Sequence, residues 1–330
     1  MMNNVFEEKS IPKAVLKLGI PAMLGSLTTL IYNIADTYFV ALTKEPAMIA
    51  AVTLCVPVLL IIMSIACIFG MGGSSVIARM IGEGRQEDSA KCFNFCTYAM
   101  AIVGLLVLVL GLLFSKQIAG IATSFGFVCA SFYYLICLAI QEKKKNALVK
   151  MSPKNFSMEK RMVANVIKIG IPGALITVML SLSNIVLNNF IGIYGSNAVA
   201  SYGIAYKIDM FPIMLSVGLS QGTAPLVGYY YGQRNEKNLS KAMKTGTVYG
   251  MILGAFFTAI LFFGNRLFAG VFLSEEGLIA QTEWFLRLLC FHAPLLGIIN
   301  MVTAYFQALG KATNSLIITI LRNRFFLFRE

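Results

Sequence analysis

The stretch Lys-Leu-Gly-Ile-Pro at residues 17–21 returns later in the chain as Lys-Ile-Gly-Ile-Pro at residues 168–172. Further identities follow the two copies at the same spacing or at one residue less: Asn33-Ile34 with Asn184-Ile185, Phe39 with Phe190, Gly72 with Gly222, and Gly82 with Gly232. Both copies are strongly apolar, so we predict two related bundles of hydrophobic helices. Many secondary transporters are built from such repeats, with the substrate site at the interface between the halves.

The apolar content of the chain predicts a membrane protein. Hydrophobic residues make up 58% of the 330 residues, and the mean hydropathy is +0.76, well above that of soluble domains. About 20 consecutive apolar residues cross a bilayer. We predict eight full spans, at Leu16–Leu42, Met48–Ala78, Phe93–Phe114, Ile118–Ile140, Val163–Ile193, Val199–Tyr229, Thr245–Phe263 and Trp284–Phe306. A ninth begins near Ser315, but we expect Arg322 and Arg324 to break it before it could cross.

The net charge of +12 is distributed as in a membrane protein and not as in a nucleic-acid-binding protein. With the N-terminus assigned to the cytoplasm, most Lys and Arg residues fall in predicted inside segments, and the outside loops hold only Lys44, Lys116 and Arg266. This is the positive-inside bias of polytopic proteins. Nucleic-acid binding would require the charges on one folded face, so we expect the lipid bilayer, and no nucleic acid, as a partner.

Residues 141–162 divide the chain into two lobes. This stretch is rich in lysine, contains Pro153 and has few apolar residues. We predict that it is a basic cytoplasmic linker between an N-lobe, residues 1–140, and a C-lobe, residues 163–330. A lipid-binding basic helix is the weaker alternative, because Pro153 interrupts the segment.

The sequence predicts neither an enzyme nor a metal site. The chain has a single histidine and seven cysteines, and their spacing completes neither a metal site nor a His-based catalytic triad. Gly310-Lys311-Ala312 lacks the other residues of a phosphate-binding loop, so we expect no ATP-driven pump. Gly246, Gly250 and Gly254 recur at every fourth residue, a spacing that lets two helices approach closely in lipid, and we interpret them as a packing signal.

Asp36 is the leading candidate for binding a coupling ion. A carboxylate at the bilayer centre costs about 2.5–3.5 kcal/mol on insertion scales, so an intramembrane acid usually serves a partner or a function. Asn33 lies three residues earlier, on the same face of a helix, so the two side chains could form an oxygen-rich pocket for a proton or a sodium ion. The second copy has Leu187 in place of Asp36. A structural carboxylate bonded to a neighbouring helix is the alternative.

A second polar group lies in the C-lobe. Lys207 and Asp209 are two residues apart and therefore do not face each other on one helix. We predict a substrate cavity lined by Tyr206, Lys207, Asp209, Gln221 and Asn184. As an alternative, Lys207 extends toward the membrane interface while Asp209 pairs with another helix. We interpret His292 as a hydrogen-bonded buried residue rather than as an ion-binding one.

At these residues the chain resembles the multidrug and toxic compound extrusion (MATE) transporters, and among them the bacterial MepA-like exporters. The stretches that carry the resemblance are residues 18–22, 33–36, 72–73, 82–84, 169–172, 186–189, 203–208, 221–222, 228–232 and 307–312. They cover most of the chain, and their order and spacing make the resemblance specific.

The resemblance implies an all-α, two-lobed helical bundle that works by alternating access. It further implies exchange of protons or sodium ions for lipophilic cationic drugs, with no other cofactor and no enzymatic activity. Asp36 occupies the place of the family's first-helix coupling aspartate, and Asn33 stands beside it. We therefore expect a monomeric, multi-pass protein of the bacterial inner or plasma membrane with a cytoplasmic N-terminus.

The chain departs from the family pattern of twelve helices. Ile118–Ile140 runs directly into the basic linker, and it resembles the start of the fourth helix joined to the end of the sixth. We expect the eleventh helix to be truncated and the twelfth to be missing. Because these departures remove walls of the N-lobe, a non-transporting membrane remnant is one alternative function. A lipid-linked oligosaccharide flippase of the same superfamily is the other, although it should carry more basic residues inside the spans.

Overall fold

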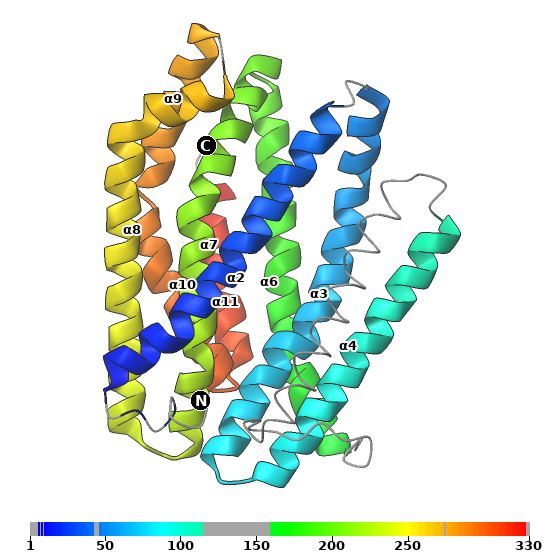
Figure 1. Cartoon of the computed structure of the whole chain (residues 1–330), viewed down its shortest axis with the longest axis vertical. Helices are drawn as coiled ribbons and strands as arrows, with labels where there is room; N and C mark the ends of the chain where they lie inside the picture. Colours follow the sequence, from blue (N-terminus) through cyan, green and yellow to red (C-terminus); the bar gives the residue numbers. More distant parts are fainter. Residues whose placement is uncertain are drawn as a thin grey trace.

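The computed structural model describes residues 6, 8, 10–42, 46–114, 159–273 and 275–327. Nearly all of these residues lie in α-helices, and the described ranges contain no strand, which confirms the predicted all-α class. The helices (Figure 1) are α2 (Ile11–Leu42), α3 (Pro46–Gly82), α4 (Gln86–Phe114), α6 (Lys160–Gly192), α7 (Ser196–Gly232), α8 (Glu236–Phe272), α9 (Glu276–Cys290), α10 (Ala293–Ala308) and α11 (Ala312–Leu327). The predicted span Ile118–Ile140 and residues 141–158 of the predicted linker lie outside the described residues.

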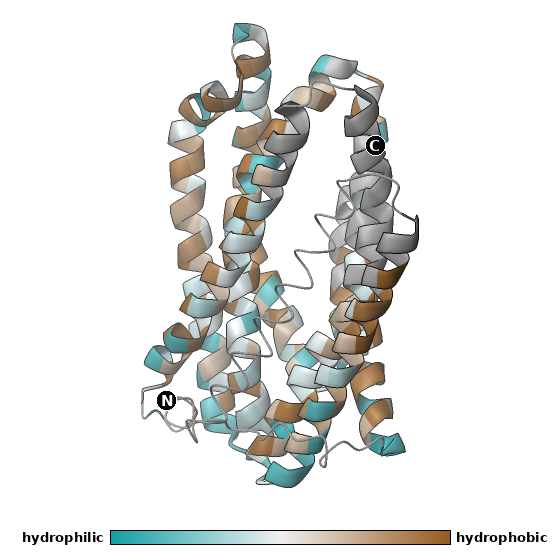
Figure 2. Ribbon diagram, turned by 45° about the vertical axis from the view of Figure 1, so that its right-hand side comes forward, coloured by the Kyte–Doolittle hydropathy of each residue, from teal (hydrophilic) through white to brown (hydrophobic). Residues whose placement is uncertain are grey.

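The lengths and surfaces of these helices confirm a multi-span membrane protein. Six of them are long and apolar enough to cross a membrane, or up to seven spans if the bent pair α9–α10 counts as one. Large apolar side chains stay exposed on the outer helices, as on Ile102 of α4 (60% exposed) and Phe263 of α8 (86%). In water this exposure would be costly, whereas lipid tails solvate it. Hydrophilic residues gather most densely at the end of the bundle that carries the N-terminus (Figure 2).

Most helices begin or end a few residues away from the predicted spans, and the differences are clearest in the C-terminal third of the chain. α8 extends beyond Thr245–Phe263 at both ends. The predicted span Trp284–Phe306 is not straight, because α9 and α10 meet at a bend of 45°. α11 continues through Arg322 and Arg324, so the expected break of the helix at these residues was wrong. Arginine is a good helix former, and a charge in an apolar segment affects its burial in lipid without removing a backbone hydrogen bond.

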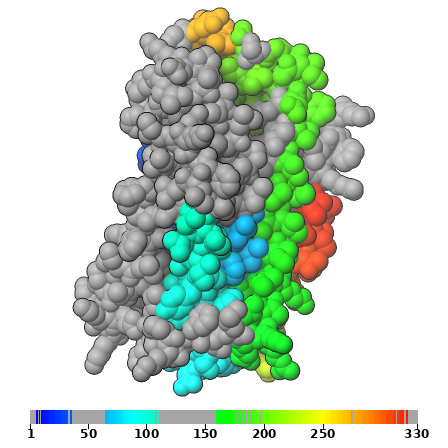
Figure 3. Space-filling model, turned by 90° about the vertical axis from the view of Figure 1, so that its right-hand side faces the viewer, coloured from blue at the N-terminus to red at the C-terminus, as the bar shows by residue number. Residues whose placement is uncertain are grey.

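The first two helices of each repeat pack on those of the other repeat. α2 packs on α7, which it crosses in Figure 1, and α3 packs on α6. Figure 3 shows α3 between α4 and α6 on another face of the molecule. Glycines bring these helices together, because a β-carbon added at Gly222 of α7 would lie 2.5 Å from the carbonyl oxygen of Leu18 in α2. Gly72 of α3, the repeat partner of Gly222, lies in the same way against α6.

α3 and α7 also meet at their C-terminal ends. A β-carbon added at Gly82 would lie 2.1 Å from the carbonyl oxygen of Tyr229, and one added at Gly232 would lie 2.2 Å from the carbonyl oxygen of Arg79. Gly82 and Gly232 are again repeat partners. The two halves therefore touch through equivalent positions at the end of the bundle that carries the turns after α3 and α7, which the charge distribution predicts to be cytoplasmic.

A side-chain bond joins α3 of the first half to the end of α10 in the second. The hydroxyl of Ser75 lies 2.6 Å from the carbonyl oxygen of Gln307 and 3.2 Å from that of Ala308. The last carbonyls of a helix have no partner within the helix, so Ser75 supplies a donor that α10 lacks. This contact is buried and links residues that are far apart in the sequence.

The glycines at every fourth residue of α8 do mark a packing surface, as predicted. They lie against α10 in register: Gly246 against Met301, Gly250 against Gly297, and Gly254 against Ala293 and Pro294. The contact is close enough that a β-carbon added at Gly254 would lie 2.5 Å from the carbonyl oxygen of Ala293. Small residues at such a seam let helix backbones approach in lipid, where no hydrophobic effect drives association.

Candidate functional site

The predicted coupling residues Asp36 and Asn33 both lie in α2. Because they are three residues apart in a continuous helix, the backbone places them on one side of α2, as the sequence analysis expected. Their side chains, and that of Asn184 in α6, lie outside the described part of the structure. Their roles therefore stay predictions.

The predicted cavity residues of α7 divide between two faces of that helix. Lys207 and Gln221 are exposed, whereas Asp209 is buried with only 1% of its surface accessible. Tyr206 is half-buried and stacks on Tyr202, with ring centroids 6.0 Å apart. Lys207 and Asp209 thus point to different sides, as their spacing in the sequence predicted.

Asp209 pairs with a residue of another helix, which is the alternative that the sequence analysis left open. Its Oδ2 lies 3.4 Å from Nε2 of His292, between α9 and α10. The ring of His292 is fixed on its other side, where Nδ1 meets the carbonyl oxygen of Leu289. The hydrogen bond to Leu289 agrees with one part of the interpretation of His292. The side chain is partly exposed rather than buried, and the interpretation omitted the carboxylate partner. Asp209 and His292 are distant in the sequence, and no spacing rule could have paired them.

His292 lies where the α9–α10 span is broken, and a proline explains the break. Pro294 has no N–H and so cannot bond the carbonyl oxygen of Cys290, four residues earlier. The hydroxyl of Thr258 in α8 donates to that oxygen instead, at 2.7 Å. Pro294 could have predicted this break from the sequence. Thr258 gave no signal, because a threonine within an apolar helix has no distinctive pattern.

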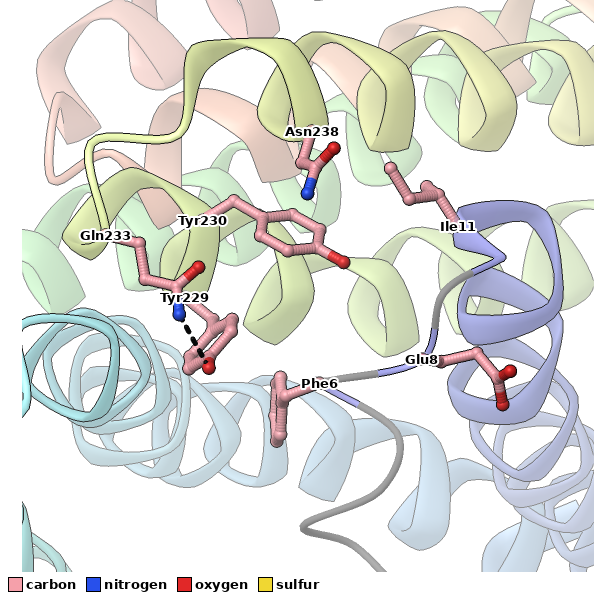
Figure 4. A pocket seen from close by; sticks show the side chains of 7 residues that line it. All are labelled: Phe6, Glu8, Ile11, Tyr229, Tyr230, Gln233 and Asn238. Atoms are coloured by element: carbon pink, nitrogen blue, oxygen red, sulfur yellow. Dashed lines mark hydrogen bonds between the residues drawn. The ribbon is translucent and has the colours of Figure 1, made fainter.

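A shallow pocket lies at the end of the bundle, away from the predicted cavity residues. It is formed where the N-terminal segment, with Phe6 and Glu8, covers the turn between α7 and α8 (Figure 4). Phe6 packs on Tyr229 with ring centroids 4.9 Å apart, and the side-chain amide of Gln233 donates to the hydroxyl of Tyr229 at 2.7 Å. Glu8 also forms an ion pair with Lys17. The pocket therefore reflects the anchoring of the N-terminal segment.

Within the described residues, no group of His, Cys, Asp and Glu side chains is arranged to hold a metal ion. The four cysteines whose state the structure describes are free: Cys67, Cys92, Cys96 and Cys290.

Comparison with known proteins identifies the family. The MatE family model matches residues 21–137 and 172–327, which is most of the chain and both of its repeats. The multidrug export protein MepA of Staphylococcus aureus is 25% identical over 392 residues, covering 96% of this chain and 86% of the relative. MepA of Staphylococcus haemolyticus is 25% identical over 387 residues. Both alignments are longer than this chain, so parts of these relatives have no counterpart here.

Solved structures agree on the fold. The outward-facing conformation of a multidrug resistance MATE family transporter has a TM-score of 0.82 at 22% identity, covering 96% of this chain and 87% of that one. A MATE crystal structure in complex with MaL6 has a TM-score of 0.80 at 22% identity, covering 97% of this chain and 88% of that one. On these matches, the chain belongs to the MatE family of multi-pass membrane transporters and is a homologue of the bacterial multidrug export protein MepA.

Proposed function

We propose that this chain exports lipophilic cationic compounds in exchange for protons or sodium ions. The two lobes would open alternately to the two sides of the membrane. The observation that carries the proposal is the contact between the halves through equivalent glycines of α2, α3, α6 and α7. Two units that meet along a symmetric seam can rock against each other about that seam. The family membership and the export activity named for MepA support it.

In this proposal Asp36 binds the coupling ion in the N-lobe, and Asn33 assists from the same side of α2. Binding of a proton or sodium ion would neutralise the carboxylate, and a cationic drug would compete for the same negative charge. Such competition is sufficient for exchange, because the two cations then bind in alternation. Tyr206, Lys207, Gln221 and Asn184 would line the path of the drug.

A non-transporting remnant is a second candidate, and one observation favours it. The MepA alignment covers 392 residues, although this chain has only 330. A transporter that lacks part of its relatives' helices could fold without completing the transport cycle. The experiment that tests the proposed function must therefore separate folding from transport.

The test is ethidium efflux from pump-deficient bacteria that express this chain, with the amount of protein in the membrane measured in each strain. We expect efflux from the parent chain and its loss in Asp36→Asn. Asp88→Asn is the matched control, because Asp88 lies at the start of α4 and pairs there with Arg85; it should transport as the parent does. Full efflux by Asp36→Asn would refute the role of Asp36. No efflux from a well-expressed parent would favour the remnant.

A further inference from the structure

We propose that Asp209 and His292 form a second proton-binding site, located in the C-lobe and distinct from Asp36. The proposal rests on the proposed antiport function, because it assigns a coupling ion, H⁺, to that process. The site joins the middle of α7 to the break between α9 and α10. The carboxylate is buried, it faces one imidazole and no other described cation, and the helices that carry the pair contact the other half of the chain.

The carboxylate of Asp209 is buried and only partly satisfied. One of its oxygens, Oδ2, faces His292 at 3.4 Å, and the other, Oδ1, has no hydrogen-bond partner among the described residues. The surroundings are apolar, since Ala205 and Ile208 of the same helix pack with Leu286 of α9 in a buried hydrophobic cluster. A charged carboxylate left in such a place without a partner would cost several kcal/mol. An unsatisfied oxygen of this kind is more typical of a functional site than of a structural bond.

The two contacts of the His292 ring, one with Leu289 and one with Asp209, favour a proton shared by the pair. Nδ1 meets the carbonyl oxygen of Leu289, which can only accept, so Nδ1 carries a hydrogen. Nε2 of a neutral ring would then present a lone pair to the carboxylate oxygen, and the two acceptors would repel each other. The contact is favourable only when one more proton is present, either on Nε2 or on Asp209. The pair therefore binds one exchangeable proton as a unit.

Within the described residues, no other cation near Asp209 can replace that proton. The titratable groups around the pair are Tyr202 and Tyr206 on α7 and Cys290 at the end of α9, all of which are neutral or anionic. Among the described side chains, His292 is the single ion-pair partner of Asp209. Lys207 is exposed on another face of α7, and the nearest arginine of α9, Arg287, pairs with Glu283. Release of the proton would thus leave an uncompensated buried charge.

The site connects helices that contact the other lobe. α7 carries Asp209 and packs on α2 through Gly218 and Gly222. α10 starts directly after His292, and at its other end its carbonyl groups accept a hydrogen bond from Ser75 of α3. The side chain of His292 is 24% exposed, whereas the side chain of Asp209 is buried, with 1% exposed. A change in the charge of the pair would then act on α7 and α10, the two helices that link the lobes.

The experiment uses the fact that His292 is the only histidine of the chain. Protein purified with a histidine-free affinity tag and labelled at histidine gives one imidazole signal by NMR, with no assignment needed. We expect this signal to change with pH as the pair gains or loses its proton, and to do so over a different pH range in Asp209→Asn. Glu283→Gln removes the carboxylate of the ion pair on α9, and its curve should match that of the parent.

The titration does not depend on transport, so the two proposals can fail separately. An imidazole that does not titrate in the parent, or that titrates identically in Asp209→Asn and the parent, overturns the proton site whatever the efflux result. If Asp209→Asn does not fold, the pH dependence of the imidazole signal is compared between Asp209→Glu and the parent instead. In cells, Asp209→Asn and His292→Gln should each lower proton-driven ethidium efflux at least tenfold. Normal efflux by either variant would also overturn the site, whereas the loss of efflux in Asp36→Asn tests Asp36 alone.

Discussion

Gly72 of α3 and Gly170 of α6 lie in direct backbone contact across the boundary between the two halves. A β-carbon added at Gly72 would lie 3.1 Å from the backbone nitrogen of Gly170 and 2.3 Å from the carbonyl oxygen of Val166. The equivalent residues of the other copies, Gly222 and Gly19, make the same contact between α7 and α2. The repeated glycines therefore form two equivalent contacts between the halves, and each half contributes one glycine to each contact.

The first prediction concerns this contact. Gly72→Ala should destabilise the protein by about 1–3 kcal/mol, because the added methyl group meets backbone that cannot move aside locally. Gly70→Ala is the matched control, since a β-carbon at Gly70 of the same helix meets no atom within 4 Å. Alanine in an unhindered helical position is favoured over glycine by about 0.5–1 kcal/mol. Thermal unfolding of the purified proteins in detergent measures the stability of both variants. Equal unfolding midpoints for Gly72→Ala and Gly70→Ala would contradict the contact.

A second prediction concerns the bond between α3 and the end of α10. Ser75→Ala removes the donor to the carbonyl oxygens of Gln307 and Ala308, and it should cost about 1–3 kcal/mol, the usual price of a buried acceptor without its partner. Ser74→Ala serves as the comparison, because the hydroxyl of Ser74 is exposed and bonds only Met71 of its own helix. Thermal unfolding in detergent should therefore separate these two neighbouring substitutions. If Ser74→Ala is the more damaging one, the bond across the lobes is not significant.

A third prediction concerns the hydroxyl that replaces the missing N–H of Pro294. Thr258→Val keeps the shape of the side chain but leaves the carbonyl oxygen of Cys290 without a donor, so stability should fall by about 1–3 kcal/mol. Thr258→Ser retains the hydroxyl and should lie close to the parent. Because the break positions His292, we also expect the NMR signal of the single histidine to shift in Thr258→Val and to remain in Thr258→Ser. An unchanged signal in the valine variant would show that the break does not depend on this bond.

A fourth prediction concerns pH and the N-terminal segment. The ion pair with Lys17 holds the pKa of Glu8 below its ordinary value of 4.5. Since the pKa is lower in the folded protein than in the unfolded chain, the pair stabilises the protein above about pH 4.5, and this contribution is lost as the pH falls through the folded-state pKa. Melting curves of the parent and of Glu8→Gln should therefore differ at neutral pH and converge in acid. High salt is the control, because it screens an exposed pair and should remove the difference. A difference that persists in acid would exclude the ion pair as its cause.

The fold was largely predictable because its signals are local or repeated. Apolar windows located the described spans, and the glycines at every fourth residue of α8 marked a real helix contact. The errors came from treating charge as a helix breaker at Arg322 and Arg324 and from missing the break before Pro294. Backbone hydrogen bonding determines where a helix ends, whereas apolarity determines only where it can lie in lipid.

The candidate site was less predictable, because its contacts join distant segments. The sequence identified Asp209 as an unusual intramembrane acid, but it placed the residue in an open cavity as its first interpretation and offered a partner on another helix only as an alternative. The partner, His292, and the support from Thr258 depend on how α7, α8 and α10 pack. That packing involves many weak contacts whose sum, and not any single pattern, sets which side chains meet.

The equivalent contacts of α2 with α7 and of α3 with α6 have the geometry of an isologous dimer, in which the same surface patch occurs on both partners. A half-length ancestor with these glycines would already have bound a second copy of itself through both contacts. Joining two such copies in one chain keeps both contacts and leaves each half free to change alone. The halves do differ in this way: Leu187 stands at the repeat position that corresponds to Asp36, and Asp209 occurs only in the second half.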